Sequence, residues 1–369
     1  MTLRTEPPFR ADHVGSLLRP EHLRVAREKW KAGELPADEL KAMEDEAIRE
    51  VVAQQERVGL HGITDGEFRR DYWHLDFMWG FDGVKPSDEV FPTHFEGQDF
   101  EARAAQVIDK VKFPASGIMR DHFKFLATTT KETAKITIPS PAMFRHRSGK
   151  NMISQAHYPD LDQFWDDLGK AYNDAVMDFA SLGCTYLQLD DVNSCVLCDE
   201  RVRGGLREQG VNPDQVLETN IRINNAAVAG RPANMKITTH MCRGNFQSLY
   251  AAEGGYDAIA EKFLTGMEID GFFMEYDDER SGGFEPLRFL PKNKFVVLGI
   301  MTSKFPELES KDELKRRIDK AAEYVALEQL CISPQCGFAS TQEGNKLTHD
   351  DQWRKLARLV EVADEVWGG

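Results

Sequence analysis

Short runs of apolar residues alternate in this sequence with longer segments in which apolar residues recur every three or four positions. The short runs favour β-strands, and the longer segments have the period of amphipathic helices. The expected strands are residues 11–18, 59–67, 134–140, 185–191, 235–242, 270–277, 294–302 and 329–337. The expected helices between them are residues 37–58, 161–183, 212–230, 256–267, 310–328 and 348–368.

Eight strands with intervening helices are the sequence pattern of an α/β protein with a (β/α)8 TIM barrel. We find no repeat and no low-complexity linker, so we expect one barrel domain over residues 1–369. The segment from 68 to 133, after the second strand, is too long for an ordinary loop. We expect this insertion to carry helices of its own and to cover the barrel mouth.

Composition narrows the class of partner. A formal net charge of −15 over 369 residues argues against nucleic acid and against an anionic membrane surface. The chain has no apolar run long enough to span a bilayer and a polar N-terminus, which predicts a cytoplasmic protein with a small-molecule substrate. Six cysteines in so long a chain do not form a disulfide scaffold, and they are free to be core residues or metal ligands.

The barrel hypothesis predicts where the chemistry lies, because active sites of this fold form at the C-terminal ends of the strands. Polar and thiol side chains gather at these ends in the sequence. They are Ser16, Glu67, Asp190, Asp191, His240, Cys242, Glu275 and Cys336. A structural role explains any one of them, but it does not explain their repeated occurrence at strand ends.

The segment "KITTHMCRGNF" places His240 and Cys242 two residues apart. Side chains at i and i+2 of a strand point to the same face, so both can reach one ion. Alone, this pair is more readily explained by two core side chains. Glu275 and Cys336 at later strand ends complete a set of nitrogen, sulfur and oxygen donors of the kind that binds Zn²⁺.

Several motifs together resemble the catalytic C-terminal barrel of the cobalamin-independent methionine synthase family, in its short single-barrel form. They are "HVGSLLRP" at 13–20, "TDGEFRRDYWHLDF" at 64–77, "LQLDD" at 187–191, "THMC" at 239–242, "FMEYDDERSGG" at 273–283 and "SPQCGFAS" at 333–340. The resemblance implies transfer of a methyl group to the sulfur of homocysteine, which forms methionine. It also implies that zinc, bound by the four donors above, keeps that sulfur ionised.

The resemblance further implies how the amino acid is held. Glu67 and Asp190 would bind the ammonium group, and Gly15 with Ser16 would bind the carboxylate. These residue types suit the task, because carboxylates pair with ammonium and N–H or O–H groups donate to carboxylates. The implied methyl donor is 5-methyltetrahydrofolate or its polyglutamate.

Two positions depart from the family pattern. "GIMTSKFPE" offers Thr302 and Ser303 where the family has a proton-donating histidine, and "PSPAMFRHRSG" offers Phe144, His146 and Arg147 where it has a folate-stacking tryptophan. Thr302, through a bound water, and His74 are the remaining candidates for the proton step. We therefore expect slow turnover with the monoglutamate folate and faster turnover with a donor whose leaving group needs no proton.

Three further features have two interpretations each. The aromatic cluster of residues 72–79 either stacks a flat donor or pins the insertion to the barrel; its members are Tyr72, Trp73, His74, Phe77 and Trp79. Arg69 and Arg70 either meet a folate glutamate tail or lie in water. Cys195 and Cys198 form a C-x-x-C motif without a second pair, and we interpret them as core or loop packing.

Two other functions stay open. One is a zinc-dependent alkyltransferase acting on another thiol, for example one that opens an epoxide; a sulfonate thiol would call for cations where Glu67 and Asp190 stand. The other is a non-catalytic protein with a closed structural zinc site. The sequence does not indicate the oligomeric state.

Overall fold

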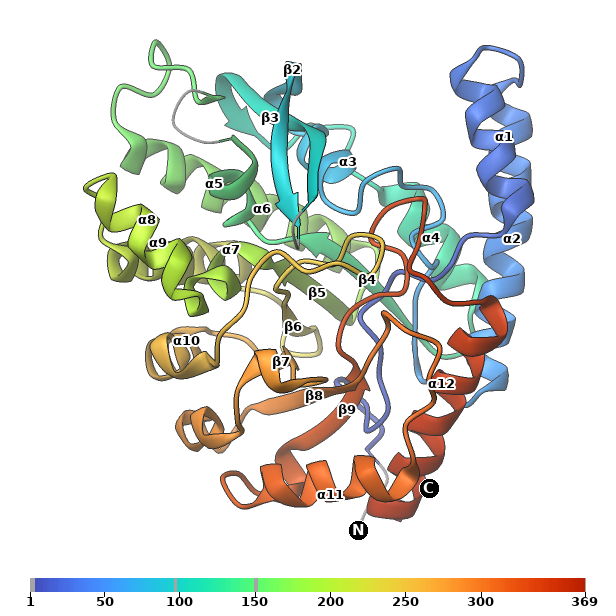
Figure 1. The fold of residues 1–369 in the computed structure, drawn as a ribbon. Helices are drawn as coiled ribbons and strands as arrows, with labels where there is room; N and C mark the ends of the chain where they lie inside the picture. The colour runs from blue at the N-terminus through green and yellow to red at the C-terminus, as the bar shows by residue number, and fades with distance from the viewer. Residues whose placement is uncertain (1–3, 96–97, 149–151, 369) are drawn as a thin grey trace.

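Seven parallel strands form one curled sheet in this computed structural model, which describes residues 4–95, 98–148 and 152–368 (Figure 1). The strand order is β1-β4-β5-β6-β7-β8-β9, so each strand pairs with its neighbours in sequence around the curl. The strands are β1 (Gly62–Ile63), β4 (Thr133–Pro139), β5 (Tyr186–Asp191), β6 (Lys236–Met241), β7 (Gly271–Glu275), β8 (Phe295–Met301) and β9 (Leu330–Pro334). The result is an α/β, TIM-barrel-like fold, and seven of the expected strands are confirmed.

Residues 11–18, the first of the eight expected strands in chain order, do not form a strand, so this prediction is wrong. Its segment makes one parallel bridge to β9, between Ala11 and Ile332. Farther along, Leu17 N–H donates to the Gly66 carbonyl beyond β1, at 3.1 Å. Between these points Gly15 has a φ of 144°, which takes the backbone out of the extended conformation. The segment therefore bonds to both edge strands of the sheet without forming a ladder.

Helices surround the sheet on its outer side (Figure 1). The expected ones are α2 (Ala37–Arg57), α6 (Leu161–Ser181), α9 (Pro213–Val228), α10 (Ala260–Gly266), α11 (Lys311–Ala322) and α12 (His349–Ala363). Several begin where a side chain caps the first turn, as at Asp160, Asn212 and Ser310. Sequence reasoning missed α1 (Glu21–Lys31) and the short α5 (Met143–Ser148), α7 (Val192–Cys195) and α8 (Glu200–Glu208). Among the described residues, no helix is both long and apolar enough to cross a bilayer.

Residues 68–133 contain two helices, α3 (Leu75–Met78) and α4 (Arg120–Thr129), and a long antiparallel hairpin of β2 (Asp82–Phe95) and β3 (Gln98–Lys112). The helices were expected and the hairpin was not, because the alanines and charged residues of β3 favour a helix locally. At the far end of β2, the Phe95 ring lies 5.6 Å from Phe246 in the loop after β6. That the insertion covers the barrel mouth stays a prediction, supported by this contact.

Candidate metal centre and substrate site

Four side chains that could hold a metal ion converge at the carboxyl ends of β6, β7 and β9. His240 lies within β6, Cys242 directly follows it, Glu275 ends β7, and Cys336 lies in the turn after β9. All four are buried, and their donor atoms lie within 4.8 Å of one another. The alternation along β6 turns His240 and Cys242 to the same side, as the H-x-C spacing predicts. The structure thus brings together the complete donor set expected from the sequence.

The geometry of this cluster fits a tetrahedral ion. The sulfur atoms of Cys242 and Cys336 are 3.5 Å apart. Two thiolates on one zinc at about 2.3 Å each would be about 3.8 Å apart, so little movement is needed. Both ring nitrogens of His240 are buried without a hydrogen bond to any described residue. Buried polar atoms normally have a partner, and a metal ion would supply one here.

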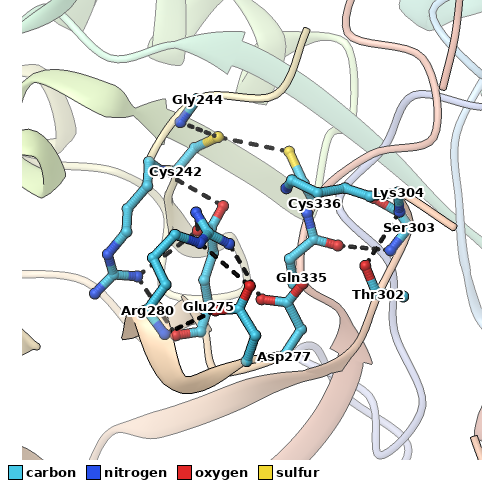
Figure 2. A network of polar contacts seen from close by, with 12 residues as sticks. Cys242, Gly244, Glu275, Asp277, Arg280, Thr302, Ser303, Lys304, Gln335 and Cys336 are labelled. Atoms are coloured by element: carbon cyan, nitrogen blue, oxygen red, sulfur yellow. Dashed lines mark hydrogen bonds and ion pairs between the residues drawn. The ribbon is translucent and has the colours of Figure 1, made fainter. Parts of the chain in front are cut away.

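The electrostatics of the cluster favour thiolate at one sulfur. The hydrogen bond from Cys242 holds the pKa of Cys336 well below its usual value, and His240 acts in the same direction against the effect of burial. The same hydrogen bond, together with burial, raises the pKa of Cys242 well above its usual value. The Cys242 sulfur also accepts the Gly244 N–H at 3.2 Å (Figure 2). A bound cation would favour thiolate at both positions.

Two arginines flank the Glu275 carboxylate. Its Oε2 lies 3.7 Å from a guanidinium nitrogen of Arg243 and 3.7 Å from one of Arg280. Its Oε1 accepts the backbone N–H of Arg243 at 3.3 Å. Arg243 is itself fixed by the Gly254 carbonyl at 2.7 Å and the Tyr256 hydroxyl at 2.9 Å. These contacts hold the carboxylate at the end of β7 and compensate its charge.

Glu67 lies beyond β1 with its carboxylate buried. Its Oε1 accepts a hydrogen bond from Thr137 of β4 at 2.9 Å and lies 3.7 Å from Arg70. Its Oε2 is buried without a hydrogen bond to any described residue. Burial raises the pKa of Glu67, although Arg70 and Arg19 oppose this. Glu67 also has a φ of 61°, a strained value for a residue with a side chain.

Asp190, near the end of β5, lies beside the metal-binding cluster. It is the direct register partner of His240 across the β5–β6 ladder. Its Oδ1 accepts a hydrogen bond from Gln188 at 2.7 Å. Burial raises the pKa of Asp190 to about 7, opposed by His240 and reinforced by the carboxylate of Glu67. The two predicted ammonium-binding carboxyl groups therefore influence each other, and one of them is next to His240 of the four-residue cluster.

Gly15 and Ser16 approach the same region from the N-terminal segment. A Cβ atom on Gly15 would lie 2.7 Å from Thr137 Cγ2 and 3.3 Å from Glu67 Oε1, so no larger residue fits. The Ser16 carbonyl accepts the Phe338 N–H at 3.0 Å. The Ser16 hydroxyl accepts the Ala339 N–H at 3.4 Å. Ser16 is thereby fixed against the turn that carries Cys336.

Comparison with known proteins agrees with this geometry. Residues 9–365 match the protein family described as "Cobalamin-independent synthase, Catalytic domain". The chain belongs to this family.

Individual relatives cover nearly the whole chain. The uncharacterized protein YxjG of Bacillus subtilis is 46% identical over 365 residues, which is 99% of this chain and 96% of that protein. The methionine synthase of Pyrococcus horikoshii is 25% identical over 355 residues, which is 96% of this chain and 91% of that protein. A solved structure from Listeria monocytogenes is 36% identical, with a TM-score of 0.80. The match covers 99% of this chain and 100% of the Listeria chain. The cobalamin-independent synthase fold thus accounts for the chain from end to end.

The two residues considered for the proton step have structural partners. Thr302, after β8, is half-buried; its hydroxyl accepts the Lys304 N–H at 3.2 Å and its own N–H donates to Glu309 at 2.8 Å. His74 is buried at the start of α3, with its ring 4.7 Å from Trp73. A catalytic role for either residue stays a prediction.

The aromatic and basic residues of the insertion are engaged in packing. Phe77 is fully buried, and the Trp79 indole N–H donates to the Ala104 carbonyl at 3.2 Å. Arg69 pairs with Glu44 at 3.1 Å, and Arg70 donates to the Thr137 carbonyl at 2.7 Å. The expectation that the two arginines lie in water is therefore wrong, because both are tied into buried networks.

Phe144, at the other departure from the family pattern, also lies in the interior. Phe144 is completely buried and packs 6.2 Å from Phe81. The side chains of His146 and Arg147 lie outside the described residues. Cys195 and Cys198 belong to the hydrophobic core, which confirms the packing interpretation.

Sequence reasoning missed two charged residues beside the cluster, Arg243 and Lys304. Arg243 directly follows Cys242, and its side chain is fully buried against Glu275. Lys304 is 3% exposed although it is a lysine in a loop. It lies two residues after Thr302, beyond the end of β8, where strand alternation does not apply, so the sequence contains no clear signal of its burial.

Proposed function

We propose that this protein is a zinc-dependent, cobalamin-independent methyltransferase that transfers a methyl group to the thiol of homocysteine and forms methionine. The main support is the adjacency of two chemically different sites. The carboxyl group of Asp190 stands across from the metal ligand His240 in neighbouring strands. A ligand that carries both a thiol and an ammonium group a few bonds apart can reach both sites at once.

His240, Cys242, Glu275 and Cys336 are the residues that would hold the ion. Zinc bound there would lower the pKa of a coordinated thiol so that the nucleophilic thiolate is present at neutral pH. The chain supplies the surroundings of that thiolate. The Gly244 N–H steadies the Cys242 sulfur, and Arg243 and Arg280 compensate the charge of Glu275.

Glu67 and Asp190 would bind the homocysteine ammonium, and Gly15 and Ser16 its carboxylate. The Glu67 Oε2 atom has no hydrogen bond within the described residues and is free to accept one from an ammonium group. The absence of a Cβ on Gly15 leaves its backbone close to Glu67. The same residues disfavour a sulfonate thiol, which would meet two carboxylates.

Methyltetrahydrofolate, with one or several glutamates, is the methyl donor to test first. We further propose that the chain acts in the cytoplasm as a single-domain enzyme, where its six thiols stay reduced.

The test uses the purified full chain loaded with zinc, incubated with homocysteine and each folate donor, with methionine as the readout. We expect methionine formation that requires zinc, and no methylation of a thiol that lacks the amino group. A protein that binds zinc but forms no methionine from any donor would refute the proposal.

A further inference from the structure

A buried lysine lies beside the metal-binding cluster and has no part in the proposed binding of zinc or homocysteine. Lys304 follows β8 and is 3% exposed. Its Nζ has neither a hydrogen bond nor an ion pair with any described residue. Three N–H donors on a buried cation without a partner are costly, because buried charges are normally paired and hydrogen-bonded.

The backbone around Lys304 is firmly positioned. Its carbonyl accepts the Ser248 hydroxyl at 2.7 Å, and the Ser248 N–H donates to Asn345 at 3.1 Å. The preceding residue, Ser303, donates from its backbone to Gln335 at 2.6 Å. Loops after β6, β8 and β9 thus converge to hold this one lysine in place.

The side chain of Lys304 reaches from the end of β8 toward the two sulfur atoms (Figure 2). Its charge also acts on neighbouring groups. It opposes the burial that raises the pKa of Asp277 to about 6. After Cys242 and His240, it adds to the causes that lower the pKa of Cys336. The Lys304 side chain is therefore close to Cys336, one of the residues that would hold the zinc to which the homocysteine thiol binds.

A simple structural role does not account for this placement. Asp277, a carboxyl group on which the lysine charge acts, is paired instead with Arg280 at 3.4 Å. Glu67 follows β1 and Asp190 lies near the end of β5, whereas Lys304 follows β8, three strands along the sheet from β5. Without a partner among the described residues, the Lys304 N–H groups remain available to the second substrate.

We propose that Lys304 is a catalytic residue whose ammonium group contacts and protonates the donor atom that releases the methyl group. This rests on the proposed methyl transfer. The thiolate electron pair forms the new sulfur–carbon bond, and the old bond to carbon breaks with its electron pair remaining on the leaving atom. That atom takes a proton from Lys304, and the amine regains one from water.

The assignment specifies the class of donor. A leaving atom that must take up a proton, such as the amine nitrogen of an N-methyl compound, benefits from a fixed N–H donor. A methylsulfonium ion leaves as a neutral thioether without a proton, and its positive charge is repelled by the ammonium. The protein should therefore prefer an N-methyl donor to a sulfonium donor, contrary to the expectation drawn from Thr302 alone.

The test compares Lys304→Met, Lys304→Arg and the unmodified protein, with Lys346→Met as control. Lys346 is an exposed lysine whose backbone contacts the same Ser248. Methionine formation is measured with methyltetrahydrofolate and with S-methylmethionine, a sulfonium. Zinc content and, in cobalt-substituted protein, the thiolate absorption on adding homocysteine are measured in parallel.

We expect Lys304→Met to keep its zinc and its homocysteine absorption and to lose about 10²–10⁴ in kcat/KM with the folate. Lys304→Arg should be similarly slow, because a guanidinium keeps the charge but does not release its proton. Any sulfonium activity should not fall, and Lys346→Met should behave as the unmodified protein.

Other outcomes overturn the assignment. They are equal losses with both donors, full activity of Lys304→Arg, loss of zinc in Lys304→Met, or an unmodified protein that uses only sulfonium donors. If the unmodified protein makes methionine from no donor, the proposed function fails, and this result is distinguishable from all of these.

Discussion

The proposed metal-binding side and the proposed amino-acid side of the site use the ends of neighbouring strands but satisfy their charged groups differently. On the metal side, four donor atoms lie within 4.8 Å of one another, and arginines compensate Glu275. On the amino-acid side, burial raises the pKa of both Glu67 and Asp190. The first side is arranged for a cation held by several donors at once. The second keeps carboxyl groups in an unfavourable environment that a substrate ammonium would relieve.

The largest effect should follow from breaking the metal side. Cys242→Ser with Cys336→Ser removes both sulfur donors, and we expect zinc content to fall from about one ion per chain to a trace, with loss of all methyl transfer. Metal analysis of the purified variant measures this. Cys184→Ser, a buried cysteine outside the cluster, is the control and should keep its zinc. Full zinc content in the double variant would show that the ligands are misassigned.

Breaking the amino-acid side should leave the metal in place. Glu67→Gln removes one charge from the ammonium site, and we expect homocysteine affinity to fall about 10- to 100-fold, the usual worth of a charged hydrogen bond. Binding is measured by titration of the zinc-loaded protein. Glu261→Gln, on the exposed face of α10, is the control. Equal binding of homocysteine and of a thiol without the amino group would remove the basis for this side of the site.

The raised pKa of Asp190 should make homocysteine binding depend on pH. Because its pKa is raised to about 7, the carboxylate that binds ammonium forms as the pH rises through 7. Homocysteine affinity should increase from pH 6 to pH 8, and Asp190→Asn should flatten that part of the profile.

The raised pKa of Asp190 changes the stability of the fold with pH in the direction opposite to its effect on homocysteine binding. The folded protein holds the Asp190 proton more tightly than the unfolded chain, so this group makes folding less favourable as the pH rises from about 4 to 7. Asp190→Asn should therefore raise the Tm by a few degrees at pH 8 while it weakens substrate binding. A lower Tm in thermal unfolding at pH 8 would contradict this account.

The smallest effect is expected at Thr302, at the margin of the metal side. Thr302→Val removes the hydroxyl that accepts a hydrogen bond from the backbone N–H of Lys304. This loss should cost about 1 kcal/mol of stability. Methyl transfer should fall much less than in Lys304→Met. A loss as large as that of the lysine variant would instead support a water held by Thr302 in the proton step.

The sequence allowed the metal side to be predicted more fully than the amino-acid side. His240 and Cys242 follow from strand alternation, and Glu275 and Cys336 from their places at strand ends, because these are local patterns. The environment of Glu67 depends on Thr137 and Arg70 folding against it, and on a φ of 61° that the sequence does not reveal. The sequence therefore identified Glu67 as a candidate, but it did not reveal that the pKa of Glu67 is raised.

The errors in the fold and the site share a physical cause. Residues 11–18 have the composition of a strand, but the backbone at Gly15, which packs closely against Thr137 and has a φ of 144°, interrupts the pairing that begins between Ala11 and β9. β3 has helical composition, but it pairs with β2. Lys304 is polar, and its burial depends on loops from three strands. In each case long-range contacts override the local preference.

The separation of the metal ligands along the chain has a consequence for biosynthesis. Cys242 and Cys336 are 94 residues apart, and β7, β8 and β9 lie between them. A chain leaving the ribosome can present His240, Cys242 and Glu275 long before the last ligand emerges. A zinc site built from all four residues could therefore assemble only after β9 has been synthesised and docked. Acquisition of the metal would then be one of the last steps of folding, and nascent chains shorter than this would hold the ion weakly or exchange it.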